Sequence, residues 1–357
     1  LEPWYNLNRI DQIIGRGVRN KSHCALPFTN RTVEIFLYGT ILQNPELEAI
    51  DLYVYSDQPQ LAWEKYGPIF LWDTSLITNM DYLFTPKFHI KTKIRGTSMV
   101  KINRYLAEKA YKKYNMVDFN ENLNDWDTSK VTSMRSLFSG FSNFNQPLDK
   151  WDVSKVEDMT NMFAHCTKFN QNLNSWNVEK VRNMKRMFTG CRNFNQPLDQ
   201  WKTDSLEDIC EMFEFAEKFN HSLNTWDVSQ VTDMRGTFYG CKKFNQPLDL
   251  WNTQNVENMA YLFYDCKNFN QDINSWDVSQ VKKMDNMFYD CFHFNQPLNL
   301  WNVEKVYNMH GTFQNCRHFN QPLESWKPIK VKYMTKMFMG AESFNSAING
   351  WKLGEVN

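Results

Sequence analysis

Residues 144–166 read FNQPLDKWDVSKVEDMTNMFAHC, and near-copies of this stretch follow one another through most of the chain. The copies lie 25 residues apart, without a gap, from Phe119-Asn120 to Phe344-Asn345. One tryptophan marks each copy: Trp126, Trp151, Trp176, Trp201, Trp226, Trp251, Trp276, Trp301, Trp326 and Trp351. An unbroken period of this length predicts a stack of similar coils, because each coil must meet its neighbour in the same register.

Within one copy, the residue pattern changes from strand-like to helix-like. Residues 148–153 favour β-structure and follow Pro147, so we expect a short strand there. The apolar residues of 156–163 lie at i, i+3, i+6 and i+7, a spacing that predicts a short helix. Ser154 and Glu157 have the spacing of a capping box at its start. The pattern predicts an α/β repeat.

The stretch at 144–166 and its copies resemble the repeat of the BspA-like branch of leucine-rich-repeat surface proteins. The resemblance covers about residues 118–357. It implies an α/β repeat solenoid, a leucine-rich-repeat-like right-handed coil with a parallel sheet on one face. It also implies that the protein binds other macromolecules and does not catalyse a reaction.

Alternate copies differ at one position. Proline occupies it in every second copy (Pro147, Pro197, Pro247 and Pro297), whereas Asn, Ser or Asp stands there in the copies between. Pro322 breaks the alternation. This pattern indicates that the array grew by duplication of a 50-residue pair.

Two repeated residue types allow more than one interpretation. The tryptophans could form a ridge for carbohydrate stacking, but their spacing between apolar residues favours a place in the core. The asparagine after each first phenylalanine could bind ligand, or its amide could satisfy backbone groups of the next coil. We favour the structural role for both.

Most cysteines occupy one column of the repeat, where Phe141, Ala216 and Ala341 stand in other copies. Their spacing matches no metal motif, so we expect buried free thiols that pack as small apolar groups. Oxidation between neighbouring coils is the alternative. The column comprises Cys166, Cys191, Cys241, Cys266, Cys291 and Cys316.

The residue after each tryptophan is mostly Asp or Asn, and Lys202 and Lys327 interrupt this series. On a strand, a residue next to an inward tryptophan faces outward, which predicts an exposed strip. We expect a protein partner to bind at this Asp/Asn strip: Asp127, Asp152, Asn177, Asp227, Asn252, Asp277 and Asn302.

The first part of the chain has a different character. Gln12, Gly15, Arg16 and Arg19 resemble the last motif of superfamily 2 helicases, and about residues 8–55 resemble helicase-like NTPases of large cytoplasmic DNA viruses. The resemblance implies that the arginines contact a nucleotide phosphate, provided that the rest of a helicase is supplied. The chain has no G-x-x-x-x-G-K-[ST] loop. We therefore expect no enzyme activity and no cofactor.

Residues 69–84 match the repeat pattern, although an insert separates them from the array. The insert, about 85–117, is strongly basic, and its helical pattern over 99–114 predicts either a cap on the first coil or a nucleic-acid contact. The contact would use Lys101, Arg104, Lys109, Lys112 and Lys113. The chain thus divides into a helicase-tail-like region (1–67), a stray repeat with a basic cap (68–117) and the coil array (118–357).

The chain has 357 residues with 40 Lys+Arg and 40 Asp+Glu, so its net charge is zero. This balance argues against a purely electrostatic nucleic-acid binder. Residues 1–117 carry a net charge of +4 and the repeats −4. Apolar runs are too short for a membrane span, and no secretory leader is visible, so we expect a cytoplasmic, host-cytoplasmic or virion location.

Three functions remain open from the sequence. The first is a protein-interaction scaffold, which the repeats favour. The second is a nucleic-acid-associated helicase or transcription accessory, which the N-terminal arginines and the basic insert favour. The third is a structural component of a virus particle, in which a rigid rod would serve as a spacer.

Overall fold

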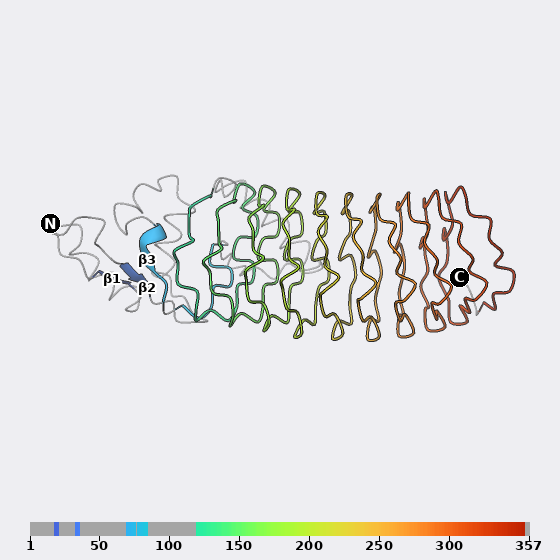
Figure 1. Ribbon diagram of the computed structural model, residues 1–357, viewed down its shortest axis with the longest axis horizontal. Coiled ribbons are helices and arrows are strands. Elements are labelled where there is room, and N and C mark those ends of the chain that lie inside the picture. The colour runs from blue at the N-terminus through green and yellow to red at the C-terminus, as the bar shows by residue number, and fades with distance from the viewer. Residues whose placement is uncertain (1–17, 21–32, 36–68, 76, 85–118, 354–357) are drawn as a thin grey trace, which may run out of the picture.

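The computed structural model describes residues 18–20, 33–35, 69–75, 77–84 and 119–353. Each 25-residue repeat forms one coil, and the coils stack along the longest axis of the molecule (Figure 1). We name each coil by its first residue, a phenylalanine, so that coil 144 comprises residues 144–168. Successive coils are joined by isolated parallel bridges between residues one repeat apart, such as Ser133 with Asp158 and Asp158 with Asn183.

Four short elements precede the array. They are β1 (Val18–Asn20), β2 (Val33–Ile35), the 3₁₀-helix η3 (Ile69–Leu71) and β3 (Trp72–Asp73). The strands form one sheet in the order β1-β2-β3, in which β1 pairs antiparallel with β2, and β2 pairs parallel with β3.

The strand expected over 148–153 and the helix expected over 156–163 are both absent. Backbone N–H groups of alternate residues, from Met159 to His165, donate instead to carbonyls of the next coil at 2.6–2.9 Å. Asn161 and His165 have positive φ angles of 57° and 65°, and an α-helix cannot pass through such residues. Tight turns therefore replace the helix, because the neighbouring coil takes the hydrogen bonds that a helix would make internally.

The capping box expected at Ser154 is also wrong. The backbone N–H of Ser154 donates to the carboxylate of Asp152 at 2.9 Å. With no helix to cap, this local hydrogen bond closes an Asx turn over residues 152–154.

Stacked aromatic rings form the core of the array. Trp201 is 2% exposed, and the other tryptophans from 126 to 326 are likewise buried. The two phenylalanine columns interlock, since Phe163 stacks on Phe169 at 4.2 Å between ring centroids and on Phe188 at 5.7 Å. The expectation that tryptophan is core is confirmed, and a carbohydrate ridge on these rings is excluded because the rings are covered.

The asparagine column forms a continuous ladder. The side-chain oxygen of Asn120 accepts the backbone N–H of Asn145 at 2.8 Å, and Asn145 accepts the N–H of Asn170 in the same way. The same bond recurs down to Asn345. The expected backbone-satisfying role of these amides is confirmed.

The proline alternation has a structural cause. In coils without the proline, the side chain at that position accepts a local N–H, as Asn172 does from Asn174. Asn174 then donates its amide to Asp199 of the following proline coil at 2.8 Å and accepts the backbone N–H of Gln200 at 3.1 Å. The next interface uses a hydroxyl, because Thr225 donates to the carbonyl of Asp199. Two kinds of coil interface therefore alternate.

The described cysteines, Cys166, Cys191, Cys210, Cys241, Cys266, Cys291 and Cys316, are buried and free. In the column, each thiol donates to a phenylalanine carbonyl of the preceding coil, as Cys166 does to Phe138 at 3.0 Å. Burial raises the pKa of Cys166 well above its usual value. The prediction of buried free thiols is confirmed.

The stray repeat stacks directly on the array. Asn79 bridges Ser133, and the indole N–H of Trp126 donates to the carbonyl of Ile69 at 2.9 Å. Residues 69–75 and 77–84 thus take the place of the coil before coil 119, although residues 85–118 separate them from it in the sequence.

Candidate functional site

All seven residues of the Asp/Asn strip are exposed. Each also has a local structural task, because its side-chain oxygen accepts the backbone N–H two residues later. For example, Asp227 accepts the N–H of Ser229 at 2.8 Å and Asn302 accepts that of Glu304 at 3.1 Å. The hydroxyl and the N–H of Ser129 lower the pKa of Asp127, so this carboxylate stays charged. The strip is therefore preformed, with carboxylates fixed at their turns.

Two hollows lie along the strip. One of 570 Å³ includes Asn177, and another of 440 Å³ includes Asp227. Lys202, which interrupts the strip, lines both of them together with Glu179 and Gln200. The structure thus places the exposed polar strip beside concave surface over coils 169 to 219.

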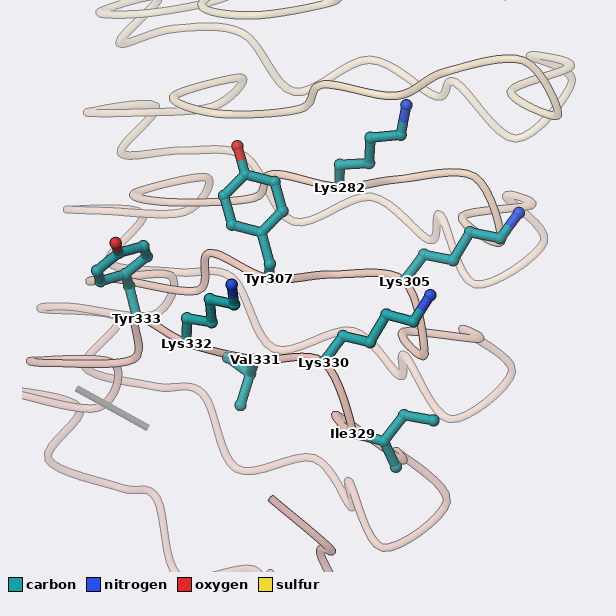
Figure 2. A pocket seen from close by; sticks show the side chains of 8 residues that line it. All are labelled: Lys282, Lys305, Tyr307, Ile329, Lys330, Val331, Lys332 and Tyr333. Atoms are coloured by element: carbon teal, nitrogen blue, oxygen red, sulfur yellow. The ribbon is translucent and has the colours of Figure 1, made fainter. Parts of the chain in front are cut away.

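A third hollow, of 690 Å³, lies on coils 269 to 319. Figure 2 shows Lys282, Tyr307 and Lys332 following one another on successive coils, with Lys305 and Lys330 beside them. Its remaining lining residues are Ile329, Val331 and Tyr333. We call these eight residues the Lys/Tyr hollow.

The charges in the Lys/Tyr hollow are only partly compensated. Lys282 pairs with Glu257 at 2.7 Å, and Lys305 donates to the amide oxygen of Gln280 at 2.6 Å. Among the residues that the structure describes, neither Lys330 nor Lys332 makes an ion pair. Both are exposed. The hollow therefore presents excess positive charge to solvent.

Comparison with known proteins agrees with the repeat pattern. Residues 106–226, 207–319 and 272–357 match the family described as "Mycoplasma protein of unknown function, DUF285". These overlapping stretches cover well over half of the chain. The chain belongs to the DUF285 family. Its description names no catalytic activity.

One curated relative of this DUF285 protein is named "Putative ATP-dependent RNA helicase L538", from Acanthamoeba polyphaga mimivirus. The two chains are 34% identical over 82 residues, which are 22% of this chain. The match spans 18% of that relative's length.

Most N-terminal site predictions for the DUF285 protein lie outside the described residues. These are Gln12, Gly15, Arg16 and the basic patch of Lys101, Arg104, Lys109, Lys112 and Lys113. Arg19 lies in β1, where it pairs in register with Glu34 of β2.

Within the described ranges, no three His, Cys, Asp or Glu side chains gather as metal ligands. In the same part of the chain, no helix has the length and apolar character that a bilayer crossing needs.

Sequence reasoning missed the Lys/Tyr hollow of the DUF285 array, although a signal was present. One exposed position of the repeat is a glutamate in every second coil from coil 144 to coil 244: Glu157, Glu207 and Glu257. In the next three coils the same position holds Lys282, Tyr307 and Lys332. Acids are therefore absent from this exposed column in coils 269 to 319, and the repeat alignment alone shows this change.

Proposed function

We propose that this protein is a non-catalytic scaffold that binds another protein along the Asp/Asn strip. The buried columns are nearly uniform from coil to coil, whereas the exposed positions differ. The residue before each tryptophan, for instance, is Ser175, Gln200, Thr225 and Leu250 in successive coils. A uniform core with a varied surface is typical of repeat proteins whose extended face binds partners.

The observation that carries this proposal is the pair of hollows that meet at Lys202. They join preformed acidic and amide groups to concave surface, a combination that allows shape and charge to be matched together. Asn177 and Asp227 mark the two sides of this surface.

Site-specific photo-crosslinking in the source cells tests the proposal. A crosslinking amino acid at position 177 or 227 should capture the same protein, and one at Lys218, which is exposed at another point of the coil, should not. Capture of the same set of proteins from all three positions, or of none, would contradict a binding surface at the strip.

We further propose that the coils belong to the leucine-rich-repeat-like class, as a right-handed solenoid with parallel pairing on one face, and that their repeats are BspA-like. The parallel bridges at one-repeat intervals and the DUF285 match support this proposal. An experimental structure of the array tests it, and a left-handed coil would contradict it.

A second candidate function concerns the N-terminal region. We propose that residues 8–55 derive from the C-terminal motif of a helicase-like NTPase, and the name of the mimivirus relative supports this origin. Because the chain has no phosphate-binding loop, residues 1–357 alone should not hydrolyse ATP. Measurable ATPase activity that disappears in Arg16→Ala would contradict this account.

A further inference from the structure

The Lys/Tyr hollow combines an apolar floor with a cationic rim. Val331 is fully buried and Tyr307 is half-buried, whereas Ile329 and Tyr333 are 46% and 47% exposed. Lysine side chains cover apolar surface with their stems and keep their ammonium groups in water. A ligand here meets rings and methylenes below and positive charge around it (Figure 2).

The surroundings extend this positive charge. The Asp/Asn strip ends at Asn302, and the equivalent residue of the next coil is Lys327. Coils 294 and 319 carry six Lys and Arg residues against three acids, the half-buried Glu304, the exposed Glu324, and Glu342, which pairs with Arg317. An anionic ligand is therefore favoured on coils 294 and 319.

We propose that the Lys/Tyr hollow binds single-stranded nucleic acid. A base lies against the exposed ring of Tyr333, and the flanking phosphates contact Lys305, Lys330 and Lys332. Lysines from successive coils supply charges in a row, as a phosphodiester chain requires, and a tyrosine ring stacks on any base. The site is separate from the Asp/Asn strip and does not depend on the scaffold proposal.

An acidic protein segment fits the hollow less well. Carboxylates would pair with the ammonium groups at the rim but would leave the exposed Ile329 and Tyr333 without an apolar partner. A nucleotide offers both a flat ring and a phosphate at short spacing. Duplex nucleic acid is disfavoured because its bases are stacked inside and cannot reach Tyr333.

The test measures fluorescence anisotropy of a labelled 12-nucleotide oligo-dT or oligo-U with the full chain at several salt concentrations. If the three lysines contact phosphates, log K falls with log salt with a slope of about −2.1. Lys305→Ala/Lys330→Ala should reduce the slope to about −0.7 and weaken binding on the order of 25-fold at 0.1 M salt. Tyr333→Leu should weaken binding at least about fivefold, and Tyr333→Phe should not.

Matched controls come from the same column at the other end of the array. Lys155 and Lys180 occupy the repeat position of Lys305 and Lys330 and are likewise exposed, so Lys155→Ala/Lys180→Ala should bind like the unchanged chain. Thermal unfolding checks that both double variants keep their fold.

Several outcomes would overturn the proposal. One is equal weakening by both double variants, and another is no weakening by either. A third is loss of binding only in Lys109→Ala/Lys112→Ala/Lys113→Ala, which would place the nucleic acid on the basic insert. A fourth is displacement of the oligonucleotide by a 12-residue polyglutamate as effectively as by unlabelled oligonucleotide, which would favour an acidic protein partner. None of these results affects the crosslinks expected at positions 177 and 227.

Discussion

The indole N–H of Trp226 donates a 3.0 Å hydrogen bond to the backbone carbonyl of Leu198, in the preceding coil. The same bond recurs at every described tryptophan of the array, as with Trp176 and Leu148. Each tryptophan therefore fills the core of its own coil and also fixes the register of the coil before it.

Trp226→Ala should destabilise the array strongly. The change removes a side chain that is 3% exposed and leaves a cavity, at a cost of about 3–5 kcal/mol. Chemical denaturation measures the free energy of unfolding. Leu250→Ala is the control, since Leu250 is 69% exposed and should change this energy by less than about 0.5 kcal/mol. Similar losses in both variants would show that the tryptophans are not core.

Asn220→Ala should cost about 1–3 kcal/mol, because it removes the acceptor of the backbone N–H of Asn245 and leaves that donor unpaired. Asn220→Asp keeps an oxygen at the same place and should cost less. The midpoints of urea unfolding for the two variants decide the matter. If Asp proves as damaging as Ala, the ladder does not act through its oxygen.

Gly240→Ala should lower the melting temperature. Gly240 has a φ of 71°, and an added Cβ would lie 2.7 Å from the ring of Phe215. The left-handed backbone alone costs a non-glycine residue about 1–2 kcal/mol. Gly350→Ala serves as the comparison, because nothing lies within 4 Å of its Cβ position, and it should leave the melting temperature nearly unchanged.

The free energy of unfolding should fall as the pH rises above about 8.5, the ordinary pKa of a cysteine thiol. Burial raises the pKa of Cys210 to about 11 and that of Cys166 well above its usual range. The folded state thus holds its protons where unfolded thiols lose theirs, so the stabilisation present below pH 8.5 is lost as the pH rises toward 11. Each thiol contributes up to about 1.4 kcal/mol per pH unit.

Urea unfolding at pH 7.5 and pH 10 measures this loss. Other groups also titrate in that range, so Cys166→Ala/Cys191→Ala isolates the thiol contribution and should show a shallower decline. An identical decline in both proteins would mean that these two thiols ionise alike in the folded and unfolded states.

The period, the core columns, the asparagine ladder and the free thiols could be predicted from the sequence, because the same residue recurs in nearly every copy. The backbone of the turns could not. The first left-handed position of each coil is Asn161, Arg186, Glu211 and then Gly236, and arginine and glutamate give no sign of a positive φ. The apolar spacing of 156–163 therefore suggested a helix, although hydrogen bonds to the next coil decide the conformation.

The candidate sites were predictable to different extents. The Asp/Asn strip follows from one repeated column, and its exposure is confirmed, but the turn that each side chain closes depends on the local backbone. The Lys/Tyr hollow joins residues as far apart as Lys282 and Tyr333. Only the stacking of coils brings such residues together.

Because two kinds of coil interface alternate, the repeating unit of this array is a pair of coils. Deleting coil 194 would place Asn174 next to Asn224, the equivalent residue of another coil without the proline. The hydrogen bond that Asn174 donates to Asp199 would be lost. A duplication or deletion of two coils preserves the alternation of coil interfaces. A duplication or deletion of one coil places two coils of the same kind next to each other. The consecutive proline coils, which contain Pro297 and Pro322, are such a pair of like neighbours. The same two coils carry most of the Lys/Tyr hollow.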